Sequence, residues 1–186
     1  MIYGRCMLPN ISPQLSTRLD AASRTMHILW FALMASVATY GSAVFVIASQ
    51  GEDAPARLPL PSFVFPMVAV MLAITGSVLY RQQTSPDRIR TLLQEKRAAD
   101  SQEQQLGLSE RELRLNRVPG LVFTGAIIRW ALFESIAVLG LVLGISHLSF
   151  EDFVPYGIAA LALQAMTPPK VRQVTLSAVP LLPSDA

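Results

Sequence analysis

Residues 26–48 read MHILWFALMASVATYGSAVFVIA, a run of 23 residues without a single charged side chain. A helix rises about 1.5 Å per residue, so this run covers about 34 Å and exceeds the ~30 Å hydrocarbon core of a bilayer. Three further apolar stretches follow, at residues 63–79, 121–145 and 153–166. The pattern predicts four transmembrane helices.

The fourth stretch is the shortest, with only 14 residues. That length also fits a re-entrant or partly inserted helix. We expect a full span that begins nearer Leu148 and Phe150 and ends at the double proline Pro168-Pro169, because proline breaks a helix.

The composition of the whole chain agrees with a membrane location. Of 186 residues, 52% are hydrophobic and 15% are charged, whereas soluble domains are about one quarter charged. This excludes an ordinary water-soluble domain and a largely disordered chain. The net charge of +2 argues against nucleic acid as a partner. The single cysteine, Cys6, allows neither an intrachain disulfide nor a zinc cluster.

The first apolar stretch also has some features of a cleaved signal peptide. Arg5, Arg18 and Arg24 precede it, and residues 46–48 resemble a cleavage site. Signal peptides, however, have apolar cores of about 7–15 residues. The longer run predicts a retained helix.

The distribution of Lys and Arg predicts the orientation. The N-terminal segment, the middle loop and the C-terminal tail hold 13 of the 15 cations, and the two loops between them hold one. Because cytoplasmic loops are rich in Lys and Arg, both termini are expected in the cytoplasm. The predicted fold class is all-α, a membrane four-helix bundle. Its parts are 1–25 and 168–186 (cytoplasmic termini), 26–80 and 120–167 (paired spans) and 81–119 (a cytoplasmic insertion).

The insertion carries the signals of two short helices. Ser85 followed by Pro86 predicts the start of an amphipathic helix that runs to about Gln105 and breaks at residues 106–108. Ser109 and Glu112 then form a capping-box pattern. This predicts a solvated helical hairpin; a membrane-surface helix or a docking element for a partner are the alternatives. The tail after residue 170, with two prolines, is expected to be extended or disordered.

Aromatic and basic side chains mark the expected membrane interfaces. Tyr80, Arg129 and Trp130 are predicted at the cytoplasmic interface and Tyr156 at the external one, because Trp and Tyr are enriched there.

Glu134 is the only acidic residue within any predicted span. A charge at the bilayer centre costs roughly 2.5–3.5 kcal/mol on insertion scales, so such a residue suggests function. Two roles remain open: a hydrogen bond that packs helices, or binding of an ion or proton. Arg129 lies about 140° away around the helix and is not a ready partner.

The run from Ala131 to Leu143, ALFESIAVLGLVL, resembles the carboxylate-bearing helix of rotary ATPase proteolipid (c) subunits. The resemblance implies that Glu134 is the ion-binding position. It covers about 15 residues, and the long charged loop and the single glycine of the second span depart from that family. The overall layout is similar to small uncharacterised bacterial inner-membrane proteins, which implies that location.

Small residues recur at helical spacing in three spans. They are Ala137, Gly140 and Gly144 in the third span, Ala69, Ala73 and Ser77 in the second, and Ala35, Thr39 and Ala43 in the first. Such rows allow helices to approach closely. They predict packing within the bundle, with homodimerisation as the alternative.

We find no pattern typical of catalysis or metal binding. His27 and His147 are expected at opposite ends of the membrane, without the spacing of metal ligands. We therefore predict a non-enzymatic protein without cofactor, an accessory or structural subunit whose partners are the bilayer and a second copy or a larger membrane complex. The alternatives are a proton- or cation-coupled transport component that uses Glu134 and, last, a membrane-embedded enzyme.

Overall fold

The computed structural model describes residues 11–50, 63–94 and 108–182. Helix accounts for 88% of them, and these ranges contain no strand. The all-α prediction is confirmed. The predicted features at Cys6 and Arg5, the first external loop and residues 95–107 lie outside the described ranges.

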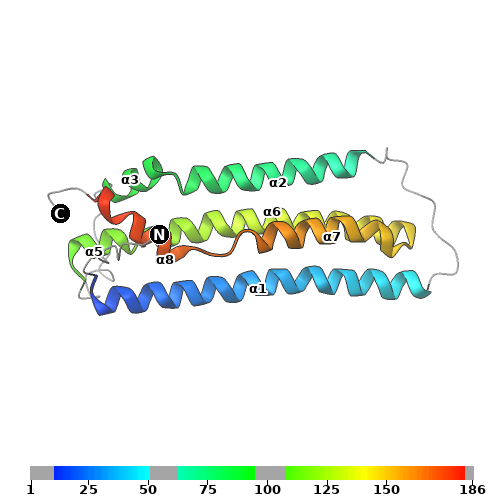
Figure 1. Ribbon diagram of the computed structural model, residues 1–186, viewed down its shortest axis with the longest axis horizontal. Coiled ribbons are helices and arrows are strands. Elements are labelled where there is room, and N and C mark those ends of the chain that lie inside the picture. The colour runs from blue at the N-terminus through cyan, green and yellow to red at the C-terminus, as the bar shows by residue number, and fades with distance from the viewer. Residues whose placement is uncertain (1–10, 51–62, 95–107, 183–186) are drawn as a thin grey trace, which may run out of the picture. The chain divides into compact units, whose positions relative to one another are not determined.

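Seven α-helices and one 3-10 helix are present in the described ranges (Figure 1). They are α1 (Pro13–Gln50), α2 (Val64–Gln83), α3 (Pro86–Gln94), α5 (Glu110–Leu115), α6 (Val118–His147), α7 (Phe150–Ala165), α8 (Val171–Ser177) and η1 (Val179–Leu181).

The chain divides into two compact units, and α1, α2 and α6 contribute to both. The bundle unit comprises residues 27–80 and 126–169, and the basic unit comprises the remainder. The described residues of the basic unit include ten Lys or Arg and four Asp or Glu. Those of the bundle unit include one Arg and three acids.

The bundle unit is built from parts of α1, α2, α6 and α7 around an apolar core. Its central residues are Val37, Val44, Ile136, Ala137, Phe153 and Ala160. The Phe153 ring packs against two glycines: a Cβ atom would lie 2.9 Å from it at Gly41 and 2.7 Å at Gly157. Real Cβ atoms do not approach so closely, so the Phe153 ring would have to shift if either glycine gained a side chain.

Three helical stretches are long and apolar enough to cross a membrane, by length and composition. They are α1, α2 and the stretch Glu110–His147, which contains α6. The α7 helix has 16 residues and is not among them. It ends at Ala165, just before Pro168-Pro169, as the sequence predicts.

The fourth apolar helix begins before residue 153, as predicted, and its start is Phe150. Leu148 lies in the left-handed region with φ 49°, in the turn between α6 and α7. The Ser149 N–H donates to the Gly144 carbonyl at 2.9 Å, which closes the end of α6. The helix therefore begins at Phe150 and excludes Leu148.

Both predicted helix starts of the insertion are present in the basic unit. The Arg88 N–H donates to Ser85 Oγ at 3.3 Å at the start of α3. The capping box of Ser109 and Glu112 forms with both of its hydrogen bonds at the start of α5. The α3 helix packs against α5 and η1 through its buried residues Ile89 and Leu93.

The prediction of an extended or disordered tail is wrong. Residues 171–181 form α8 and η1. Val171, Thr175 and Ala178 recur at helical spacing and are all buried, so one face of the segment is part of a core. Pro180 does not interrupt it, because it lies at the start of η1, where a missing N–H leaves no hydrogen bond unmade.

Candidate functional site

Glu134 of α6 faces α1 within the bundle unit. Its Oε1 atom accepts hydrogen bonds from Ser36 Oγ at 2.6 Å and from Tyr40 OH at 2.8 Å. Ser36 and Tyr40 are four residues apart, so α1 presents both hydroxyls on one face. The Glu134 side chain is half-buried.

This arrangement ties two helices together through one carboxylate oxygen. Both donors belong to α1 and the acceptor belongs to α6, so each hydrogen bond links the two helices. The geometry favours the packing role of Glu134. Its role in ion or proton binding stays a prediction. No sequence pattern indicates the two hydroxyl partners, since only the relative rotation of α1 and α6 brings them to Glu134.

The small residues of α6 face other helices of the same chain. A Cβ at Gly140 would lie 2.6 Å from Tyr156 Cβ, and one at Gly144 would lie 2.6 Å from Val44 Cγ1. Ala137 is completely buried. This row therefore packs against α1 and α7, which favours bundle packing over homodimerisation at this face.

The small-residue rows of α2 and α1 differ in their burial. Ala69 and Ala73 of α2 pack against the core, and Ser77 Oγ donates to the Ala73 carbonyl at 2.8 Å. The row of Ala35, Thr39 and Ala43 on α1 is exposed instead. Only the α1 row is left open to a partner or to lipid.

A second polar cluster surrounds the C-terminal end of α7. The Trp30 indole N–H donates to the Gln164 carbonyl at 2.9 Å. The Trp130 indole N–H and Arg129 Nη2 donate to the Thr167 carbonyl at 3.1 and 3.4 Å. Carbonyls at the end of a helix lack partners within it, and the prolines that follow have no N–H to offer. The indole and guanidinium groups therefore supply the hydrogen-bond donors for these carbonyls.

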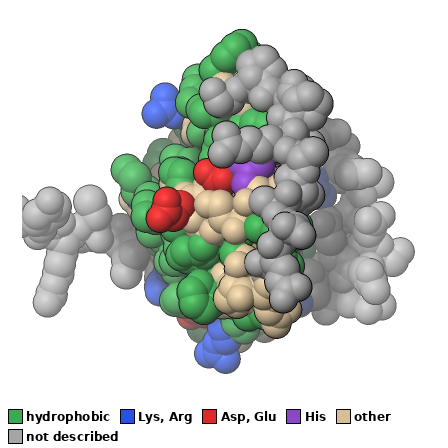
Figure 2. All heavy atoms as spheres, turned by 90° about the vertical axis from the view of Figure 1, so that its right-hand side faces the viewer, with side chains coloured by type: hydrophobic (Ala, Val, Ile, Leu, Met, Phe, Trp, Pro, Cys, Tyr) green, Lys and Arg blue, Asp and Glu red, His purple; other side chains and the backbone are tan. Residues whose placement is uncertain are grey.

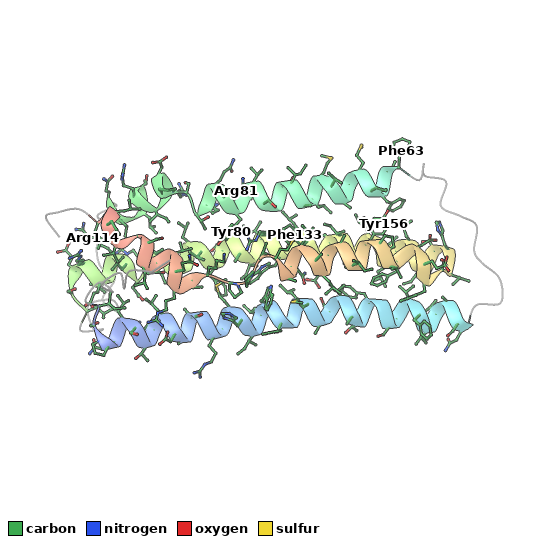
Figure 3. The ribbon with its side chains drawn as sticks, viewed as in Figure 1. Phe63, Tyr80, Arg81, Arg114, Phe133 and Tyr156 are labelled. Atoms are coloured by element: carbon green, nitrogen blue, oxygen red, sulfur yellow. The ribbon has the colours of Figure 1, made fainter. Side chains whose placement is uncertain are left out.

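Arg129 and Trp130 lie inside the bundle unit. Trp130 is completely buried and Arg129 is 9% exposed. The guanidinium carbon of Arg129 lies 3.7 Å from the centre of the Tyr80 ring, and Figure 3 shows Tyr80 between α2 and α6, as it does Phe133. Trp130 thus offers no lipid-facing surface, and the predicted interfacial depth of Tyr80, Arg129 and Trp130 stays a prediction.

A histidine and a carboxylate are in contact at the turn between α6 and α7. His147 Nδ1 lies 2.7 Å from Asp152 Oδ2, and Figure 2 shows histidine next to acidic side chains on this face. The described residues contain no group of three His, Cys, Asp or Glu that could hold a metal ion. The pair therefore acts as a local link across the turn.

Glu112 has a role in the basic unit that its capping pattern does not reveal. Its Oε1 atom accepts from the Ser12 N–H at 2.7 Å, and its Oε2 atom accepts from the Ser109 N–H at 3.1 Å. The Ser12 side chain first, and then the N–H groups of Ser12 and Ser109, lower the pKa of Glu112 from 4.5 to about 2. One carboxylate thus joins the start of α1 to the start of α5.

A pocket of about 650 Å³ lies beside this carboxylate. Its lining mixes polar and apolar residues: Ile11, Ser12, Pro13, Ser109, Arg111, Glu112, Leu115 and Val179. Both Glu112 oxygens are already engaged by backbone donors, so the carboxylate is structural there.

Comparison with protein-family models, curated proteins and solved structures found no match to this chain.

Proposed function

We propose that this chain is a non-enzymatic integral membrane protein that acts as a structural or accessory subunit. The observation that carries the proposal is the uncovered apolar face of α2. Met67, Val70, Met71, Ile74 and Val78 are 44–60% exposed. Such a face is unfavourable in water at roughly 25 cal/mol per Å², so lipid or another membrane helix covers it.

The proposed topology has four spans with both termini and residues 81–119 in the cytoplasm of a bacterial inner membrane. The excess of Lys and Arg in the basic unit supports this orientation. The α7 helix is the fourth span. Its 16 residues cover only about 24 Å, so the bilayer thins around it or neighbouring helices shield its ends.

The exposed row of Ala35, Thr39 and Ala43 on α1 is the proposed face for a partner helix. A groove of about 750 Å³ between α1 and α7, with an almost wholly apolar lining that includes Phe45, Phe150 and Ile158, offers a further apolar surface in the same unit. The Ser36 hydroxyl donates to the Glu134 carboxylate, but the sequence has no pattern typical of catalysis, which is why we prefer a subunit to an enzyme.

Extraction in a mild detergent, followed by identification of co-purifying subunits, tests the accessory role. We expect a stable larger assembly that Ala35→Leu and Thr39→Leu weaken, because bulky side chains prevent close helix approach. A matched Ile28→Leu variant on the exposed side of α1 should leave it intact. A monomer under these conditions would count against the proposal.

Proton- or cation-coupled transport through Glu134 is the second candidate, since this half-buried carboxylate lies among apolar helices. It also agrees with the resemblance to proteolipid helices. Under this candidate, Glu134→Gln abolishes ion flux in proteoliposomes while insertion is retained. Under the packing role, Glu134→Gln and Tyr40→Phe both lower the thermal unfolding midpoint, and no ion flux depends on either residue.

A further inference from the structure

The groove between α1 and α7 is long and narrow. Its lining residues all belong to these two helices, and its volume is about 750 Å³. The α7 wall extends from Phe150 to Leu161, which corresponds to about 16 Å of helix. The α1 wall extends from Val37 to Val46. These dimensions suit an elongated occupant.

Small residues keep the groove open above the ring of Phe153. That ring lines the groove and is buried, so it forms the floor. Gly41 of α1 and Gly157 of α7 pack against the ring, and a Cβ at either glycine would collide with it. At one end the rings of Phe45 and Phe150 meet edge to face at 5.7 Å. The groove is therefore built into the contact between the two helices.

The lining of the groove favours a hydrocarbon occupant. Among the described residues, Ser42 is the only polar one in the lining. Its hydroxyl already donates to the Ala38 carbonyl of the same helix at 3.0 Å. A hydrocarbon chain leaves no hydrogen bond unmade here, and its burial is favourable.

The size of the groove favours a single chain over a partner helix. A helix with its side chains is at least about 10 Å wide, so a 16 Å length of it takes up roughly 1,300 Å³. The groove offers about 750 Å³. A hydrocarbon chain is much narrower than a helix and fits lengthwise.

An unpaired carboxylate lies at the Phe150 end of the groove. Glu151 precedes the lining residue Ile158 by seven residues, or two helical turns, so both lie on the same side of α7. Glu151 is exposed, and no described residue forms an ion pair with it. Figure 2 shows acidic side chains at the surface of this face. The one Arg among the described residues of the bundle unit, Arg129, contacts Thr167 beyond the opposite end of α7. This end of the groove therefore complements a cation.

We propose that the groove binds one acyl chain of phosphatidylethanolamine, with the headgroup ammonium at Glu151. The primary ammonium donates N–H groups to the carboxylate, whereas the quaternary ammonium of phosphatidylcholine has none to donate. The proposal rests on the membrane placement proposed above. The two can fail separately, because insertion is measured by fractionation and lipid binding is measured on purified protein.

The test incubates full-length protein in detergent with phosphatidylethanolamine, phosphatidylcholine or phosphatidylglycerol of identical acyl chains, and counts bound lipids by native mass spectrometry. We expect saturable binding of one phosphatidylethanolamine. Ala38→Phe should bind at least about tenfold more weakly, because its ring takes the place of several methylenes. Ala43→Phe is the matched control: Ala43 is also exposed on α1 but lies outside the lining, so binding should match the wild type.

A second variant tests the headgroup. Glu151→Gln should bind phosphatidylethanolamine about two- to fivefold more weakly, the range expected for an exposed ion pair, and phosphatidylcholine as before. Glu110→Gln, which removes an exposed carboxylate of the basic unit, should change neither affinity.

The remaining outcomes would contradict the proposal. Equal affinity for the three lipids would overturn the placement of the ammonium at Glu151. Unchanged lipid binding in Ala38→Phe, or in Ser42→Leu if Ala38→Phe does not fold, would overturn the groove as the site. Protein that is recovered in the membrane fraction but binds no lipid saturably would overturn this proposal alone. A dimer that Ala38→Phe dissociates and no lipid displaces would assign the groove to a second copy instead.

Discussion

At the scale of single residues, the glycines of α6 determine how closely its neighbours pack. A side chain at Gly140 would meet Tyr156 Cβ at 2.6 Å and the Phe153 carbonyl at 3.1 Å. Both obstacles lie on or next to the α7 backbone and cannot rotate away. The helices would have to separate to accept even a methyl group.

Gly140→Ala should therefore destabilise the protein by about 1–3 kcal/mol, the usual cost of overpacking. The measurement is the unfolding midpoint in detergent, compared with Gly120→Ala. Gly120 also lies in α6, but a Cβ there meets nothing within 4 Å. Because Ala favours a helix over Gly, Gly120→Ala should cost no stability, and an equal loss in both variants would contradict the contact with α7 as the cause.

Glu112 is expected to make the stability of the basic unit depend on pH. Its pKa falls from 4.5 to about 2 on folding. The carboxylate therefore stabilises the folded state fully above pH 4.5, and this contribution disappears as the pH falls towards 2. Because the group is partly solvent-exposed, we expect about 1 kcal/mol at neutral pH.

Glu112→Gln should lower stability at pH 7 and flatten its dependence on pH between 4.5 and 2. Denaturation followed at several pH values measures both effects. Glu110→Gln is the control: it removes an exposed carboxylate from the same turn, where the partner is Arg114 and not Ser12. A pH dependence that is unchanged in Glu112→Gln would refute the assignment.

At the scale of elements, the turn between α6 and α7 stores strain at Leu148. Its φ of 49° lies in the left-handed region, which costs a residue with a Cβ roughly 1–2 kcal/mol. Glycine is usual at this position of a helix end.

Leu148→Gly should raise the unfolding midpoint, because relief of the backbone strain exceeds the loss of a half-buried side chain. The matched variant is Ser149→Gly at the next position of the same turn, where φ is −129° and glycine offers no relief. If Leu148→Gly lowers the midpoint as much as Ser149→Gly does, the side-chain contacts of Leu148 outweigh the strain.

The sequence predicted where the helices lie in the chain better than which side chains they contact in other helices. Apolar runs and capping patterns located α1, α2, α6, α7 and the starts of α3 and α5, because these signals are local. It failed for α8, where the burial of Val171 and Thr175 against the basic unit decides the structure. It also missed Trp30, Gln164 and Thr167, since their contacts depend on which faces of α1, α6 and α7 meet.

Glu134 shows the same contrast between what local sequence predicts and what contacts between helices decide. Its isolation among apolar residues marked it from the sequence alone, and the need for a partner followed from the cost of burial. The partners Ser36 and Tyr40 lie almost 100 residues earlier in the chain. No local pattern connects hydroxyls in one helix with a carboxylate in another.

At the scale of the whole molecule, charge and apolar surface are segregated between the two units. Cations gather in the basic unit, while the bundle unit exposes large apolar side chains on α1 and α2. Under the proposed topology, a membrane surrounds the bundle unit and the cytoplasm contains the basic unit.

Cysteine accessibility in intact bacterial cells tests this claim most directly. In a Cys6→Ser background, single cysteines replace Arg90 in α3, Glu151 at the start of α7 and Gln173 in α8, and a membrane-impermeant maleimide is applied. We predict that only the cysteine at position 151 is labelled before the cells are opened, and that all three are labelled afterwards. Labelling of positions 90 or 173 in intact cells, or recovery of the protein in the soluble fraction, would contradict the account.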